Sequence, residues 1–153
     1  MRIAIAITLL AIGATLPMAS AQESNVQSLI EQRHQEMKAN GRAMKQLGGV
    51  FRGDTPYDRD AVLKAAETLS KHSGEESAAL FPDNSLKHSG SEARIEIAGN
   101  RDRFNEIFSD LNSSSKELID LARGNGSDTE MRAAFSKVAK TCSACHTDFR
   151  VKN

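Results

Sequence analysis

The sequence predicts an all-α protein, an antiparallel four-helix bundle built from residues 22–153. Apolar side chains recur at helical spacing through four segments, and no segment shows the alternation with period two that is typical of strands. Two of the three connections between these segments are short, which favours antiparallel neighbours, and one is longer. About 130 residues are enough for one hydrophobic core, so we expect a single domain.

The first helix is expected over residues 23–50, where inward positions alternate in steps of four and three. These positions are Val26, Ile30, Arg33, Met37, Asn40, Met44 and Leu47. The glycines at 48 and 49 weaken the helix at its end. Arg33 and Asn40 interrupt an apolar stripe, so we expect both to find hydrogen-bond acceptors or to reach solvent at the bundle edge.

A second helix is expected to begin after Asp58, a suitable N-cap, and to reach about residue 72. Its inward residues are Ala61, Val62, Ala65, Ala66 and Leu69. Residues 73–91 are rich in serine, glycine and charge and contain Pro82, which predicts a long connection. His72 and His88 lie at the edge of this connection or within it and are expected at the surface.

The third and fourth helices are expected over residues 94–123 and from 127 or 128 to about 150. The third carries an apolar face of Ile97, Phe104, Ile107, Phe108, Leu111, Leu118 and Leu121. Residues 124–126, Gly-Asn-Gly, end it, and Ser127 or Asp128 caps the fourth. The apolar side of the fourth helix includes Met131, Phe135, Val138, Cys142, Cys145 and Phe149.

Cys142 and Cys145, followed at once by His146, form the most specific motif in the chain. Two cysteines three residues apart and a histidine are the attachment signature of a c-type haem. On a helix the three residues share one face, so both thiols could reach the porphyrin vinyl groups while His146 coordinates the iron. The motif predicts one covalent haem c near the C-terminus.

Other uses of the two cysteines remain open on the residues alone. A redox dithiol of the thioredoxin type would sit beside a βαβ pattern, which this chain lacks. A disulfide closing so short a loop would constrain the unfolded chain little. A zinc site would need a further ligand, and His34, His72 and His88 lack the paired spacing of zinc ligands.

Residues 1–21 have the pattern of a secretory signal peptide, with Arg2, an apolar run over 3–18 and Ala-Ser-Ala at 19–21. The apolar run contains Pro17 and is shorter than the roughly 20 residues that span a bilayer. We therefore expect export to a bacterial-type periplasm without a stable membrane anchor after cleavage. The near-neutral charge gives no indication of nucleic acid or anionic membrane as partner, and no catalytic constellation is visible, so no enzyme is predicted.

The helical pattern and the C-terminal attachment motif together resemble the cytochrome c-prime (cytochrome c') family of class II c-type cytochromes. Arg33 and Met37, the segment 53–58 and the segment 141–150 carry the resemblance, which covers nearly all of residues 22–153. The segment 37–42 is similar to the low-spin branch, cytochrome c-556. The chain departs from many members in having no tryptophan before the aromatic run of the third helix.

The resemblance implies that Met37 faces the distal side of the haem. A thioether ligand there gives low-spin His/Met iron suited to electron transfer with redox partner proteins. If Met37 is only a core side chain, the iron is five-coordinate and open to nitric oxide or carbon monoxide. Met44 on the same stripe shows that packing alone could explain a methionine there, and His34 is a rival ligand one residue off the stripe.

For Arg33 and Arg150 the resemblance implies places beside the haem. The guanidinium of Arg33 suits a haem propionate, although it could also extend to water. Arg150 would lie beside the imidazole of His146 and tune its basicity, or it could simply be a basic helix end. Family members often form homodimers, but no interface can be assigned from the residues.

Overall fold

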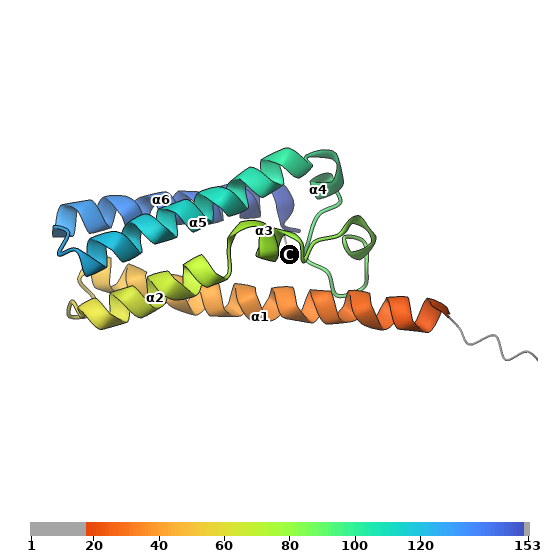
Figure 1. Ribbon diagram of the computed structural model, residues 1–153, viewed down its shortest axis with the longest axis horizontal. Coiled ribbons are helices and arrows are strands. Elements are labelled where there is room, and N and C mark those ends of the chain that lie inside the picture. Colours follow the sequence, from red (N-terminus) through yellow and green to blue (C-terminus); the bar gives the residue numbers. More distant parts are fainter. Residues whose placement is uncertain (1–17, 152–153) are drawn as a thin grey trace, which may run out of the picture.

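The computed structural model describes residues 18–151, and within them the predicted four-helix bundle is confirmed. Its long helices are α1 (Met18–Arg52), α2 (Arg59–Lys71), α5 (Arg101–Arg123) and α6 (Asp128–Phe149). Successive long helices run in alternating directions (Figure 1). The expected signal peptide lies outside the described residues except for 18–21, which begin α1.

The predicted caps of α2 and α6 are confirmed. The Asp58 carboxylate accepts a hydrogen bond from the backbone N–H of Ala61 at 3.1 Å. Ser127 and Glu130 form a capping box in which each side chain accepts from the backbone of the other. Such caps satisfy N–H groups that lack partners in the first helical turn, and therefore these two helices begin where they do.

The segment 73–91 is a long connection as predicted, but two short helices that the sequence did not indicate form within it. These are α3 (Gly74–Ala78) and the 3-10 helix η1 (Asp83–Ser85). Gly74 has φ of +74°, a conformation that favours glycine, and it lets the chain turn from α2 into α3. The few apolar residues of this polar segment are drawn inward, with Ala78, Leu80 and Leu86 buried.

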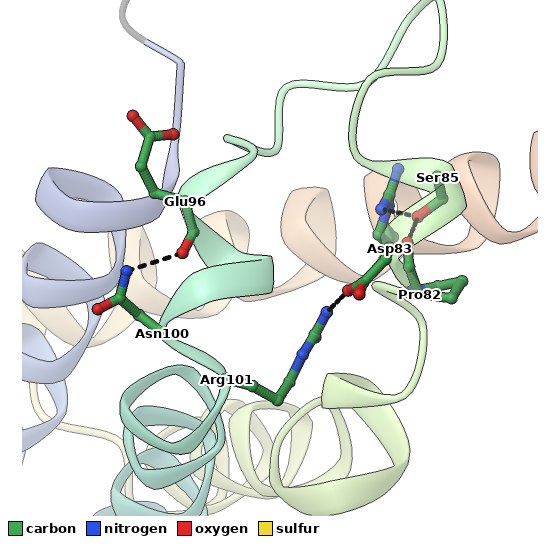
Figure 2. Close-up of polar contacts among 7 residues, drawn as sticks. Pro82, Asp83, Ser85, Glu96, Asn100 and Arg101 are labelled. Carbon is green, nitrogen blue, oxygen red and sulfur yellow. Dashed lines mark hydrogen bonds and ion pairs between the residues drawn. The ribbon is translucent and has the colours of Figure 1, made fainter.

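The expected third helix is broken into α4 (Glu96–Gly99) and α5 at Asn100, whose backbone leaves the helical region at φ −132° and ψ 40°. Figure 2 shows the Asn100 side chain donating to the Glu96 carbonyl, at 2.9 Å. It also shows Arg101 paired with Asp83 of η1. The break was not visible in the apolar pattern because Ile97 and Phe104 keep helical spacing across it.

Two clusters of buried side chains form the core. The far cluster lies where α1 ends and α6 begins; it contains Ala43, Leu47, Val50, Phe51, Val62, Ala65, Ala66, Leu69, Leu111, Leu118, Ile119, Ala122, Met131, Ala134 and Val138. The attachment cluster lies beside α3, η1 and the end of α6; it contains Ala78, Leu86, Ile97, Phe104, Ile107, Phe108 and Phe149.

The described residues contain no helix long and apolar enough to cross a membrane. In the same range, the sole β-type pairing is an isolated bridge between Ala93 and Arg150. Helix α6 therefore ends at Phe149, one residue before the predicted boundary, and Arg150 is extended.

Candidate haem site

Cys142 and Cys145 lie on α6 where the two core clusters meet. Cys142 packs against the far cluster, and Cys145 packs against the attachment cluster. Both thiols are free and partly buried. Burial raises the pKa of Cys142 and, with nearby negative charge, raises the pKa of Cys145 to about 11. The folded chain thus holds two protonated thiols in apolar surroundings.

His146 follows on the same helix but is exposed. Burial of part of the ring lowers its pKa, and the positive charge of Arg150 lowers it further, while Glu92 acts in the opposite direction. A lowered pKa favours the neutral imidazole, which is the form that binds iron. Arg150 itself is held away from the helix by Glu92, with Nη2 at 2.9 Å from the carboxylate.

Met37 is the methionine of α1 that shares an environment with the attachment motif. It is partly buried and packs against the attachment cluster, to which Cys145 and Ala144 also belong as flanking residues. Met44 packs instead against the far cluster. Met131 is buried and accepts a hydrogen bond from Tyr57 at 3.5 Å.

The rival ligand His34 is partly exposed and belongs to neither cluster in the described structure. His34 therefore lacks the contacts with the attachment cluster that Met37 makes.

Arg33 is buried in the bundle, with only 4% of its surface exposed. Its Nη1 donates to Ser85 Oγ at 3.0 Å and its Nη2 to Ser91 Oγ at 3.2 Å. Its guanidinium carbon lies 4.7 Å from the centroid of Phe81. The expected acceptors are present, but they are neutral hydroxyls from the segment between α3 and α4. Burial accordingly lowers the pKa of Arg33.

A second polar group of α1 is incompletely satisfied. Asn40 is buried and donates to the backbone carbonyl of His72 at 3.2 Å, while its own carbonyl oxygen has no partner among the described residues. Nδ1 of His72 is likewise buried without a described partner, while His72 as a whole is half-buried at the end of α2. The hydrogen bond from Asn40 to the His72 backbone carbonyl joins α1 to the C-terminal end of α2.

The residues at this end of the bundle fit a c-type haem. Paired free thiols, a neutral imidazole and a thioether are suitable for attaching a porphyrin and binding its iron. A buried cation with only neutral partners in the described chain suits the carboxylate of a propionate. Ser85, Ser91 and Phe81 were not predicted from the sequence. The sequence did indicate that an arginine on the apolar stripe of α1 needs acceptors from another element, but not which residues supply them.

Comparison with known proteins decides the family. The model of the family described as Cytochrome C' matches residues 28–150, which is most of the chain. The chain belongs to the cytochrome c' family. A cytochrome c-556 from Rhodopseudomonas palustris is 32% identical over 153 residues, covering 95% of this chain and 97% of that protein.

Solved structures of cytochromes c' share the fold. The crystal structure of cytochrome c' from Thermochromatium tepidum matches with a TM-score of 0.75 at 22% identity, covering 83% of this chain and 97% of that one. A ferrous variant of cytochrome c' from Alcaligenes xylosoxidans with bound nitric oxide matches with a TM-score of 0.72 at 23% identity, covering 84% and 97%. At these identities the likeness concerns the arrangement of helices.

Proposed function

We propose that this cytochrome c' family member is a periplasmic electron carrier with one haem c, attached through Cys142 and Cys145. In this proposal the iron is bound by His146 from α6 and by Met37 from α1. When bound, the haem supplies an iron that cycles between ferric and ferrous states. The chain supplies two axial ligands on separate helices, so that ligand movement during electron transfer is small.

The observation that carries the proposal is the packing of Met37 and Cys145 against one cluster. The two residues come from α1 and α6, which have few close backbone contacts with each other. A flat group held on α6 by its thiols would therefore meet the α1 face that carries Met37. The lowered pKa of His146 supports the opposite ligand, because it keeps the imidazole neutral.

The test is the optical spectrum of the purified holoprotein, ferric and reduced, with and without carbon monoxide. Sharp reduced bands, a ferric thioether-to-iron charge-transfer band and little response to carbon monoxide are expected. Met37→Ala should convert the protein to a high-spin form that binds carbon monoxide. Met44→Ala is the matched control, because Met44 lies on the same helix but packs against the far cluster, and it should leave the spectrum low-spin.

A gas-binding function is the second candidate, favoured by the relative solved with bound nitric oxide. It requires an open distal site, so that Met37 is a packing residue only. A wild-type spectrum that is high-spin and shifts with carbon monoxide, unchanged by Met37→Ala, would overturn electron transfer through His/Met iron and favour this candidate. An absence of haem in the wild-type protein would overturn both.

The proposed location follows from residues 1–21. A signal peptide would direct the chain to the periplasm, where redox partner proteins would exchange electrons with it. Mass spectrometry of the purified protein tests this, because cleavage after Ala21 gives a chain that begins at Gln22 and carries the added mass of one haem.

A further inference from the structure

We propose that Ser91 donates a hydrogen bond to a haem propionate carboxylate beside Arg33, and that Ser85 is a positioning residue which holds the Arg33 guanidinium toward that carboxylate. The inference deepens the proposed function, since it requires the haem attached at Cys142 and Cys145. It adds two serines from the segment between α3 and α4 to the site, neither of which belongs to the attachment motif.

The charge of Arg33 is the first step. Its side chain is 4% exposed, and every partner that it has in the described chain is uncharged: Ser85, Ser91 and the ring of Phe81. Removing a cation from water without an anionic partner is costly. A guanidinium has five N–H donors, and two of them are used by the serines. Three donors and a full positive charge remain for an anion.

Ser85 has a fixed hydrogen-bond direction. It is fully buried, and its hydroxyl donates to the Pro82 carbonyl at 2.7 Å (Figure 2). Since a hydroxyl has one hydrogen, Ser85 meets Arg33 only as an acceptor. Its place at the end of η1 is therefore set by Pro82, and it orients the guanidinium without itself being available to a carboxylate.

Ser91 differs from Ser85 in that its hydroxyl hydrogen is not used within the described part of the protein. Its oxygen accepts from Nη2 of Arg33 at 3.2 Å and from the backbone N–H of Ala93 at 3.2 Å. Both lone pairs are then in use, and its O–H has no acceptor among the described residues. A carboxylate accepts hydrogen bonds and donates none when ionised, so it matches the free O–H of Ser91 and the spare N–H groups of Arg33 together.

The position of this pair relative to the attachment motif makes the carboxylate a haem propionate. Ala93, which donates to Ser91, and Phe81, which stacks on Arg33, both pack against the attachment cluster, as Cys145 and Met37 do. Ser91 is partly exposed, whereas Arg33 is buried. A propionate on a porphyrin held by Cys145 would therefore meet Arg33 inside the protein and Ser91 at its edge.

The experiment compares the holoprotein with Ser91→Ala, Ser91→Thr and the control Ser89→Ala. Ser89 is exposed in the same loop, and its hydroxyl makes no hydrogen bond in the described structure. Resonance Raman spectra report the propionate bending bands, whose frequency rises with hydrogen bonding to the carboxylate. We expect a band to shift to lower frequency in Ser91→Ala, with a lower midpoint potential, and parent-like values in Ser91→Thr and Ser89→Ala.

Ser85→Ala is the positioning variant and should shift the same band while the iron stays low-spin. If the wild-type protein contains haem and the propionate bands are unchanged in Ser91→Ala, the inference is overturned and the proposed function is left intact. A wild-type protein without haem would overturn the proposed function and the inference together. A crystal structure of the holoprotein with Ser91 Oγ more than about 3.5 Å from both carboxylates would also overturn the inference.

Discussion

The two core clusters stabilise the bundle in different ways. In the far cluster, mostly aliphatic side chains of the four long helices pack on one another, and the helices α2 and α6 begin nearby with their own caps. In the attachment cluster, four phenylalanine rings contact at centroid separations of 5.0–5.8 Å beside a buried arginine and the free thiol of Cys145. The far end closes on apolar side chains, whereas the attachment end combines aromatic rings with a buried cation and a thiol.

The difference concerns the groups that each end leaves without a charged or covalent partner. A helix needs apolar contacts and caps to be stable, and the far cluster provides both from the chain itself. At the attachment end, Arg33 lacks a counter-charge and the two cysteines lack a covalent partner in the described residues. The comparison predicts that changes at the two ends have different signatures: stability alone at the far end, and stability together with haem properties at the attachment end.

The largest effect should come from removing the haem. The variant Cys142→Ala with Cys145→Ala should lose covalent haem, and with it the apolar contacts of the porphyrin. At roughly 25 cal/mol per Å² of buried apolar surface, the loss is on the order of several kcal/mol. Haem staining of a denaturing gel and thermal unfolding followed by circular dichroism measure the two losses. An unchanged unfolding midpoint would contradict the idea that the attachment end depends on its prosthetic group.

A matched pair of large-to-small changes comes next. Leu118 is fully buried in the far cluster, and Leu118→Ala should cost about 2–5 kcal/mol without altering the haem spectrum. The ring of Phe104 contacts the other three rings of this end, those of Phe81, Phe108 and Phe149. We therefore expect Phe104→Ala to cost about 3–5 kcal/mol.

The spectra of these variants distinguish the two ends. Phe104→Ala should also broaden or shift the haem bands, because the cluster that it loosens supports both Cys145 and Met37. Urea unfolding and optical spectra of both variants are the measurements. Equal spectral changes in Leu118→Ala and Phe104→Ala would show that the two clusters do not act separately.

A smaller effect is expected at Ser85. The change Ser85→Ala removes an acceptor of Arg33 and a donor to the Pro82 carbonyl, all in a buried setting. Leaving such groups without partners costs about 1–3 kcal/mol, which urea unfolding would detect. A loss much below this range would mean that Arg33 and Pro82 find other partners, and that the hydrogen bonds of η1 contribute little to the attachment end.

Much of the bundle could be predicted because its signals are local. Asp58 and Ser127 carry their caps within three residues of sequence, and the apolar steps of α1 identify buried positions such as Ile30 and Leu47. The attachment motif is equally local, since five consecutive residues contain both thiols and the histidine. Features of this kind need no knowledge of which elements meet in space.

The missed features depend on contacts between distant segments. Arg33 meets Ser85 and Ser91 more than fifty residues later, and no local pattern links them. The break at Asn100 was missed for a related reason: the apolar spacing continues across it, while the Asn100 side chain and the Arg101–Asp83 pair stabilise the bend. The short helices form because other elements pack against them, α5 against α3 and α1 against η1, and not because their composition favours helix.

The smallest effect, and one of opposite sign, is expected at Ser115. Like Ser85, this residue is fully buried, but its hydroxyl has no hydrogen-bond partner in the described structure. Ser115→Ala therefore removes an unsatisfied polar atom and raises helix propensity, and we expect a gain of up to about 1 kcal/mol in the free energy of unfolding. Urea unfolding of Ser115→Ala beside Ser85→Ala makes the comparison, because both variants lose the same atom from a buried site. A loss of stability in Ser115→Ala would instead mean that its hydroxyl has a hydrogen-bond partner in the holoprotein. The stability of the middle of α5 would then depend on a bound group, as we expect for the attachment end.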